Sequence, residues 1–237
     1  MNILVFGSTS GLGRSVTNIF AEKNNFILVG RSRIELENIK KNVISKGAIN
    51  VDIFEHDLAK DLNFLIEKIE NVVIHLFINM ASATSTLRDN NIGLDNIRSD
   101  VNVDLINPIL LIRHLIDRNN QLKVIFISSI LSRIKSPNRV IYSSFKSLQE
   151  VYLNKIAKHH SNKLNLLLVT IGTEIKKNRE TEKSRTLAKK IFSAYLNGEK
   201  TMFFGLKGRV FYFLYNLNPI FLRSIIYLKR KIVPLEK

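Results

Sequence analysis

The sequence predicts an α/β fold in which a doubly wound parallel sheet of about seven strands has helices on both faces. Apolar runs of four to eight residues alternate with longer segments of helical period. Runs such as 72–78 are apolar at nearly every position, which is typical of parallel strands buried on both faces. The strands are expected near residues 2–6, 26–30, 50–55, 72–79, 122–128, 164–171 and 200–204, with helices between them.

The composition indicates one globular domain with a sizeable core. Of the 237 residues, 45% are apolar and 24% are charged, which excludes a chain that is disordered throughout. The chain has no cysteine and no His-Glu-x-x-His pattern, so we expect no disulfide and no metal site. Residues 1–7 have the pattern of a buried strand and not of a signal peptide, so the cytoplasm is the expected compartment.

A glycine-rich turn follows the first predicted strand and opens a helical segment. Its residues are Gly7, Ser8, Thr9, Ser10, Gly11, Leu12 and Gly13. Glycines without a Cβ let a backbone approach a pyrophosphate closely, and the N–H groups of a helix N-terminus bind phosphate oxygens. In this strand-turn-helix context, the turn predicts a dinucleotide site.

The residues after the second predicted strand favour NADP(H). A protein that binds NAD usually has an acidic residue here for the ribose hydroxyls, whereas this chain has Arg31 and Ser32. Arg31 can form charge-assisted contacts with a 2′-phosphate, and Ser32 can bind it while capping the next helix. Arg14 and Arg33 either assist or only face solvent. Asp57, followed by Leu58, either accepts from the adenine amino group or caps the next helix.

A candidate catalytic group follows the fifth predicted strand. Ser129 ends that strand, and Tyr142 and Lys146 stand four residues apart at the start of a predicted helix. Residues at i and i+4 share one helix face, so the ammonium of Lys146 can lie near the phenol. Tyr227 and Lys231 have the same spacing, but they lie in a basic tail and not behind a strand that ends in serine.

These residues together resemble the short-chain dehydrogenase/reductase family in its ordinary, non-extended form, over about residues 1–205. Gly7, Gly11 and Gly13 match its glycine turn, although Phe6 replaces the family's threonine. The segment from Asn79 through Ala81 to Ser82 is similar to its Asn-Asn-Ala-Gly segment. The resemblance implies a Rossmann-type, NAD(P)-binding fold. It also implies a catalytic set of Asn102, Ser129, Tyr142 and Lys146.

The resemblance gives each member of this set a role. Tyr142 is the expected general acid/base, because an adjacent Lys⁺ lowers the pKa of a phenol from its ordinary value of about 10. Ser129 would donate to the substrate oxygen, and Lys146 would also hold the nicotinamide ribose. Asn102 would anchor a water that relays protons to Lys146. Tyr142 and Lys146 therefore count as cofactor-binding residues too.

The chain departs from the family pattern after the sixth predicted strand. The family has Pro-Gly and, four residues later, a threonine over the nicotinamide amide, but here Ile171 precedes Gly172 and Lys176 replaces the threonine. Thr173 could substitute in part. The loop over residues 176–183 is highly charged, which suits a polar or anionic substrate better than an apolar one.

The C-terminal residues 206–237 are predicted to form a basic, aromatic helical extension of the 1–205 domain. Residues 200–231 contain no acidic residue, and the whole chain has a formal charge of +16. Such a tail either binds the anionic inner face of a membrane or packs within the protein, on the sheet or on a second subunit. No nucleic-acid-binding motif is present. The family resemblance implies a homodimer or a homotetramer.

The tail and the charged loop also resemble, more loosely, bacterial keto-sugar reductases of cell-envelope polysaccharide synthesis, of the decaprenylphosphoryl-arabinose ketoreductase type. This resemblance implies a lipid-linked or nucleotide-linked keto-sugar as the substrate. The leading hypothesis is thus an NADPH-dependent oxidoreductase that interconverts a carbonyl and a secondary alcohol. The alternatives are a non-catalytic nucleotide-binding scaffold and a reductase of a small soluble ketone.

Overall fold

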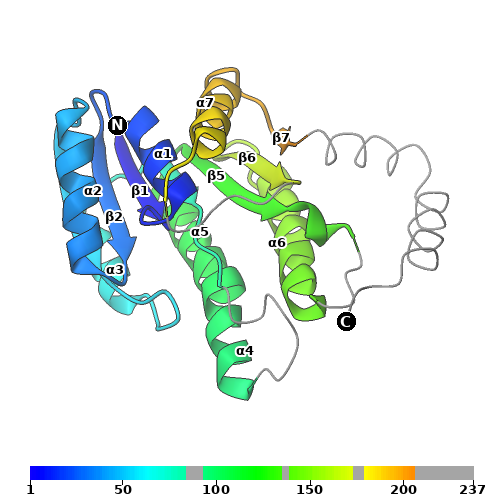
Figure 1. The fold of residues 1–237 in the computed structure, drawn as a ribbon. Helices are drawn as coiled ribbons and strands as arrows, with labels where there is room; N and C mark the ends of the chain where they lie inside the picture. Colours follow the sequence, from blue (N-terminus) through cyan, green and yellow to red (C-terminus); the bar gives the residue numbers. More distant parts are fainter. Residues whose placement is uncertain (84–92, 135–138, 173–178, 206–237) are drawn as a thin grey trace.

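A seven-stranded, all-parallel sheet forms the centre of the protein (Figure 1). The computed structural model describes residues 1–83, 93–134, 139–172 and 179–205. Across the sheet the strand order is β3-β2-β1-β4-β5-β6-β7. The strands are β1 (Asn2–Phe6), β2 (Asn25–Gly30), β3 (Asn50–Glu55), β4 (Leu76–Asn79), β5 (Leu122–Ser129), β6 (Leu164–Ile171) and β7 (Thr201–Phe204). The predicted doubly wound α/β fold is confirmed.

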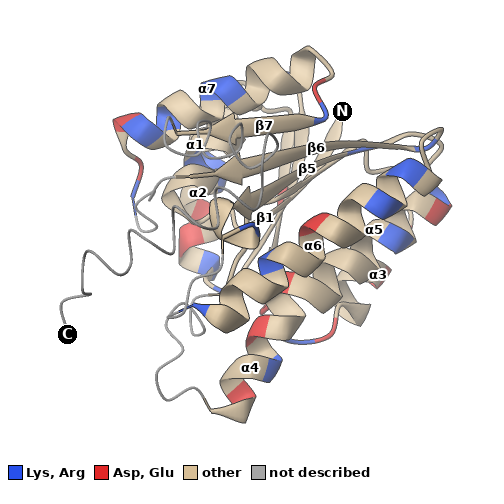
Figure 2. Cartoon of the chain, turned by 90° about the vertical axis from the view of Figure 1, so that its right-hand side faces the viewer, with Lys and Arg blue, Asp and Glu red and all other residues tan. Residues whose placement is uncertain are grey.

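Helices cover both faces of this sheet, with α1, α2 and α7 on one face and α3, α5 and α6 on the other (Figures 1 and 2). The α-helices are α1 (Gly11–Ile19), α2 (Arg33–Ser45), α3 (Asn63–Ile69), α4 (Leu94–Val101), α5 (Asn107–Arg118), α6 (Val140–His159) and α7 (Glu182–Leu196). A π-helical turn, η2 (Asn102–Ile106), joins α4 to α5, and a short 3₁₀ turn, η3 (Ile130–Ser132), follows β5.

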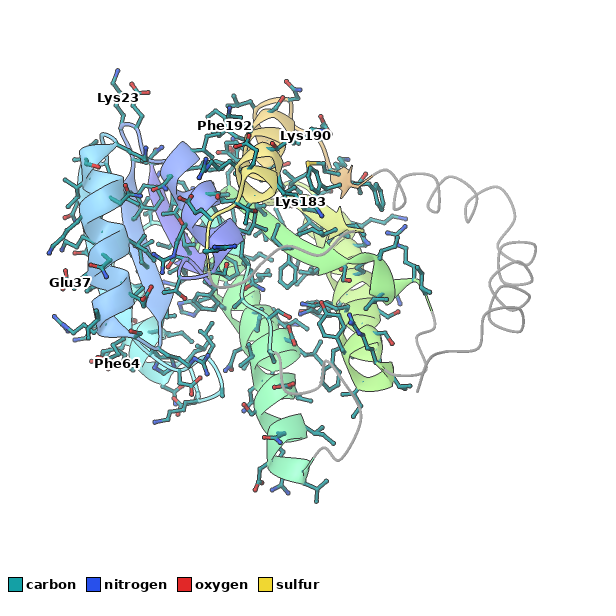
Figure 3. The ribbon with its side chains drawn as sticks, viewed as in Figure 1. Lys23, Glu37, Phe64, Lys183, Lys190 and Phe192 are labelled. Carbon is teal, nitrogen blue, oxygen red and sulfur yellow. The ribbon has the colours of Figure 1, made fainter. Side chains whose placement is uncertain are left out.

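Two apolar clusters, one on each face of the sheet, form the core. Successive side chains of a strand point to opposite faces, so Ile3 and Val5 of β1 join one cluster and Leu4 and Phe6 join the other. Charged side chains lie mainly on the helices and loops, as Figure 2 shows. Phe192 of α7 packs edge-on against Phe20, with ring centroids 4.9 Å apart, which brings α7 onto α1 (Figure 3).

The fourth strand is shorter than its apolar run predicts. The run begins at residue 72, but β4 contains only Leu76–Asn79. Val73 is 58% exposed while Ile74 is fully buried, so this part of the run is not covered on both sides. The N–H of His75 donates to the Asn2 carbonyl and leads the chain into the sheet. An apolar run alone does not show where pairing begins.

The basic extension predicted for 206–237 lies outside the described residues, so the division of the chain at residue 205 stays a prediction. Within the described part of the chain, no helix combines the length and the apolar character that crossing a bilayer requires.

The order of the strands reverses at the centre of the sheet, between β1 and β4. β1 and β4 are neighbours, yet the chain leaves β1 toward β2 and leaves β4 toward β5, on opposite faces. In open parallel sheets, this switch point leaves a crevice at the carboxyl ends of the strands. The backbones close on each other there: a Cβ on Gly7, whose φ is +80°, would lie 2.6 Å from the Ala81 nitrogen.

We predict that Gly13→Ala destabilises the protein by about 2 kcal/mol or more, because the added Cβ would lie 2.0 Å from the Gly7 carbonyl oxygen. Gly93→Ala is the matched control, since its Cβ would meet nothing within 4 Å. We expect it to cost less than about 1 kcal/mol. Urea unfolding of both variants measures the difference, and equal midpoints would contradict the packing at this turn.

Candidate active site

The glycine turn joins β1 directly to α1. Ser10 is the N-cap of α1: its Oγ accepts from the Gly13 N–H at 2.9 Å and donates to the Gly7 carbonyl at 3.0 Å. These two bonds close the turn on itself and place the helix N-terminus at the switch point. The turn therefore presents the positive end of the α1 dipole to the crevice.

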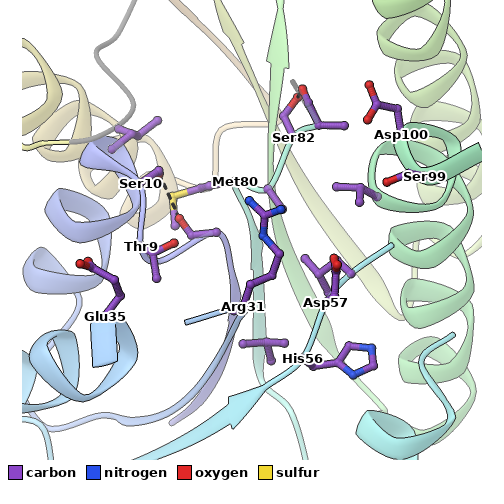
Figure 4. A pocket seen from close by; sticks show the side chains of 18 of the residues that line it. Thr9, Ser10, Arg31, Glu35, His56, Asp57, Met80, Ser82, Ser99 and Asp100 are labelled. Carbon is purple, nitrogen blue, oxygen red and sulfur yellow. Dashed lines mark hydrogen bonds between the residues drawn. The ribbon is translucent and has the colours of Figure 1, made fainter. Parts of the chain in front are cut away.

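A cavity of about 830 Å³ opens at this crevice (Figure 4). Its walls come from the ends of β1, β2, β3 and β4, the start of α1, and α4. It is lined by these residues of the predicted cofactor site: Gly7, Thr9, Ser10, Leu12, Arg31, Asp57, Leu58 and Ala81. The structure thus brings together residues that lie up to 74 positions apart in the sequence.

The other predicted cofactor residues shape the surroundings of the cavity. Ser8, Gly11 and Gly13 are buried within the turn. Asn79 is fully buried, and its Oδ1 accepts from the Ala81 N–H at 3.3 Å.

Two further cofactor predictions lie at other strand ends. Ser32 caps α2 by accepting from the Glu35 N–H at 3.4 Å, and the Gly172 N–H donates to the Phe204 carbonyl at 2.9 Å. Thr173 and Lys176 lie outside the described residues.

The basic residues near the cavity are not equivalent. Arg14 forms an ion pair with Glu35, and its Nε donates to the Thr9 carbonyl at 3.2 Å. Arg33 lies outside the cavity lining, 3.9 Å from Glu37 on the exposed face of α2. Arg31 has no hydrogen bond or ion pair among the described residues, and Figure 4 shows it extending into the cavity.

Asp57 caps a turn and also faces the cavity. Its Oδ1 accepts from the Ala59 N–H at 3.0 Å, which closes the turn after β3. The N-cap of α3 is Leu62, so Asp57 does not cap that helix. His56, which the sequence analysis did not single out, lines the cavity beside Asp57 and stacks on Phe64.

Tyr142 and Lys146 occupy the first turns of α6. The Lys146 Nζ lies 5.7 Å from the centroid of the Tyr142 ring, as the i, i+4 spacing predicts. The Lys146 side chain is only 2% exposed, whereas Tyr142 is half-buried. The Lys146 ammonium therefore lies inside the protein, while the Tyr142 side chain is partly exposed to solvent.

Ser129 and Asn102 are near this pair in the fold, and both make local bonds. Ser129 is the last residue of β5, and its Oγ accepts from the Leu131 N–H at 3.2 Å at the start of η3. The Asn102 side-chain amide donates to the Ala59 carbonyl at 2.8 Å. Both η3 and η2 pack against α6, so these two residues flank the helix that carries the Tyr-Lys pair.

Asp104, which the sequence analysis missed, is the direct partner of Lys146. Its Oδ1 lies 2.9 Å from the Lys146 Nζ, and its side chain is fully buried. Burial by itself would lower the pKa of Lys146, but the charges of Asp104, Tyr142 and Glu150 outweigh it and raise that pKa above its ordinary value. A lysine that is buried needs a buried acid as its partner, and Asp104 is the acidic residue two positions after Asn102, so the sequence did contain a signal for this pair.

A second buried acid, Glu150, fixes the ends of two strands. Its Oε1 accepts from the hydroxyls of Ser128 and Ser132 at 2.7 Å each, and its Oε2 lies 3.0 Å from the Arg133 Nε. Glu150 follows Lys146 by four residues on α6. It thereby ties the loop after β5, which begins with Ser129, to the helix that carries Tyr142.

The fold and the site define a doubly wound α/β protein with a cavity at its switch point and a Tyr-Lys pair on α6. The family model described as short chain dehydrogenase matches residues 1–187. Because this match covers most of the chain, the protein belongs to the short-chain dehydrogenase family. Members of this family are oxidoreductases that use nicotinamide cofactors.

Individual relatives are distant. The chain is 26% identical over 167 residues to Dehydrogenase/reductase SDR family member 7B of Xenopus tropicalis, which covers 64% of this chain and 53% of that protein. It is 26% identical over 189 residues to Dehydrogenase/reductase SDR family protein 7-like of Drosophila melanogaster, with 72% and 56% covered. The chain thus spans about half the length of the curated relatives it matches.

The fold similarity is closer than the sequence similarity. A solved structure of a short-chain dehydrogenase from Sphingobium yanoikuyae in complex with NADPH superposes with a TM-score of 0.80 at 15% identity. The superposition covers 94% of each chain, so the two proteins share a fold over nearly their full length.

We predict that Glu150→Gln destabilises the protein by about 3 kcal/mol, because it removes a buried carboxylate charge that accepts from the hydroxyls of Ser128 and Ser132 and pairs with Arg133. The control is Glu70→Gln, which removes an ion pair with Arg118 that is about half-exposed. That change should cost less than about 1 kcal/mol. Thermal unfolding of the two variants measures the difference, and a stable Glu150→Gln protein would show that the Glu150 network does not hold the site.

Proposed function

We propose that this protein is an NADP(H)-dependent oxidoreductase that interconverts a carbonyl and a secondary alcohol by hydride transfer. The observation that carries the proposal is the placement of Tyr142 against a buried Lys146, on a helix that packs against η2, η3, β5 and β6. Membership of the short-chain dehydrogenase family supports the reaction class.

The cavity fits a nicotinamide dinucleotide. Its volume of about 830 Å³ is within the range of ligand sites, and the glycine turn brings a helix N-terminus to its wall. The Glu35 carboxylate is paired with Arg14, so it does not oppose a phosphate there. Among the residues that the structure describes, Arg31 is a cavity-lining cation with no hydrogen bond or ion pair, and it would hold a 2′-phosphate, which supports NADP(H) over NAD(H).

The proton chemistry rests on three side chains. When bound, the nicotinamide cofactor supplies or takes up the hydride. In the reducing direction Tyr142 donates its phenolic proton to the carbonyl oxygen, and the Lys146 ammonium stabilises the phenolate that is left. The Ser129 hydroxyl stands at the end of β5 to donate to the same oxygen as its negative charge develops. Lys146 would also hold the nicotinamide ribose.

The substrate is proposed to be polar or anionic, of the kind of a keto-sugar linked to a lipid phosphate or a nucleotide. The formal charge of +16 and the charged segment 176–183 support this class over an apolar ketone. Contact of the tail with the inner face of a membrane is part of the same proposal and rests on the composition of 206–237 alone. Turnover of a small apolar ketone at a higher kcat/KM than a phosphorylated keto-sugar would contradict it.

We further propose that the protein self-associates as a homodimer or homotetramer. Exposed apolar side chains on two neighbouring helices support this, since Leu110 of α5 and Leu148 and Val151 of α6 are each about half-exposed. Burying such a face against a second copy is favourable.

We expect Tyr142→Phe to reduce kcat by about 100-fold or more, because the phenolic proton is lost while the ring is kept. NADPH binding, followed by nicotinamide fluorescence, should remain. Tyr195→Phe is the control, since Tyr195 belongs to α7, on the opposite face of the sheet from α6, and packs there against Phe20. Unchanged turnover in Tyr142→Phe would contradict the enzyme proposal and favour a nucleotide-binding scaffold.

Arg31→Ala should weaken NADPH binding by about tenfold or more and leave NADH binding nearly unchanged, because only NADPH has a 2′-phosphate. Arg33→Ala removes an equal charge two residues away that does not line the cavity, and it should change neither affinity by more than about twofold. Fluorescence titration with both cofactors measures this. Equal losses of NADPH affinity in the two variants would contradict a specific contact with Arg31, because the effect would then come from the net positive charge of this region.

A further inference from the structure

A buried ion pair connects the π-helical turn η2 to α6. Lys146 is 2% exposed and Asp104 is 0% exposed, and their charged atoms are 2.9 Å apart. The second carboxylate oxygen of Asp104 accepts from the Ala83 N–H at 3.2 Å. Ala83 lines the cavity after β4, so one carboxylate joins α6 to the wall of the cofactor cavity.

Asp104 lies in the π-helical turn between two buried amide contacts. The amides of Asn102, at the start of η2, and of Asn107, at the start of α5, donate to the carbonyls of Ala59 and Leu58, each at 2.8 Å. Asp104, between them, contacts Lys146 instead. A π-turn is wider than an α-turn and is frequently found at functional sites.

We propose that Asp104 is a positioning residue of the active site, which fixes the Lys146 ammonium beside Tyr142 and balances its charge. The inference rests on the proposed oxidoreductase function and concerns the same site. Asp104 acts through Lys146, and it does not itself need to touch the substrate or the cofactor.

Asp104 is the charged group that pairs directly with the Lys146 ammonium. Tyr142 and Glu150 face Lys146 from its own helix, and Glu150 is paired with Arg133, which follows η3. β6 has no charged residue, and the one charged residue of β5, Lys123, is at the opposite end of that strand. Among these elements, only Asp104 offers a carboxylate bound to the ammonium.

Removing this charge should move the ionisation of Tyr142 to lower pH. A buried ammonium without an anionic partner is costly, and the nearest group that can become an anion is the Tyr142 phenol. An anion near a phenol opposes its ionisation, so losing Asp104 favours the phenolate for this second reason as well.

The test compares wild type with Asp104→Asn, which has nearly the same shape and no charge. The ultraviolet absorbance of tyrosinate is followed against pH, and the same titration in the Tyr142→Phe background is subtracted. We expect the Tyr142 midpoint to fall by about one pH unit or more in Asp104→Asn. The pH dependence of kcat/KM for alcohol oxidation should shift in the same direction.

Two further variants separate positioning from packing. Asp104→Glu keeps the charge and should keep the wild-type midpoint, while Asp104→Ser is a second neutral variant that should shift it as Asp104→Asn does. An unchanged or higher midpoint in the neutral variants, or an equal shift in Asp104→Glu, would overturn the proposal. Failure of both neutral variants to fold would also overturn it, because Asp104 would then be a residue of the folding core.

The absorbance titration needs no substrate, so it distinguishes this inference from the proposed function. If wild type reduces no carbonyl compound with NADPH but the midpoint shifts as expected, the function proposal fails and the role of Asp104 stands. If wild type is an active reductase and the midpoint does not move, only the role of Asp104 fails.

Discussion

The structure depends on one electrostatic constraint: the Lys146 ammonium is buried, and a buried charge requires a partner of opposite sign. Asp104 supplies it, which places η2 against α6 at a fixed separation. The same carboxylate binds the backbone of Ala83, so the constraint extends to the loop after β4. Asp104 therefore connects the wall of the cavity to the helix that carries the Tyr142–Lys146 pair.

Helix α6 distributes this constraint to the rest of the site. Tyr142, Lys146 and Glu150 follow one another at intervals of four residues and so lie along one face. Lys146 is bound to η2, and Glu150 is bound to the segment that begins at Ser128. The helix thus holds the buried side chains of Lys146 and Glu150 in fixed positions, while Tyr142 at its start remains partly exposed. At the cavity, Arg14 is paired with Glu35, whereas Arg31 has no hydrogen bond or ion pair within the described part of the chain.

Most of the fold and the framework of the site could be predicted from the sequence, because they depend on local patterns. Apolar runs located the strands, the glycine spacing located the turn at β1, and the i, i+4 rule placed Lys146 beside Tyr142. The pairing of Lys146 with Asp104 spans 42 residues and involves a residue of a π-turn, and no local pattern signals either feature. The length of β4 depends on which residues find a strand partner, so its apolar run alone overestimated it. The roles of the site residues, and every inference on 206–237, stay predictions.

A crystal structure of the protein with NADPH would test the central claim most directly, since it shows the cofactor and the buried pair together. The account predicts the 2′-phosphate on Arg31 and the nicotinamide ribose within hydrogen-bond distance of the Lys146 Nζ. It also predicts that Asp104 stays bound to that same ammonium. A cofactor bound away from Arg31, or a Lys146 that leaves Asp104 and Tyr142 when NADPH binds, would contradict it.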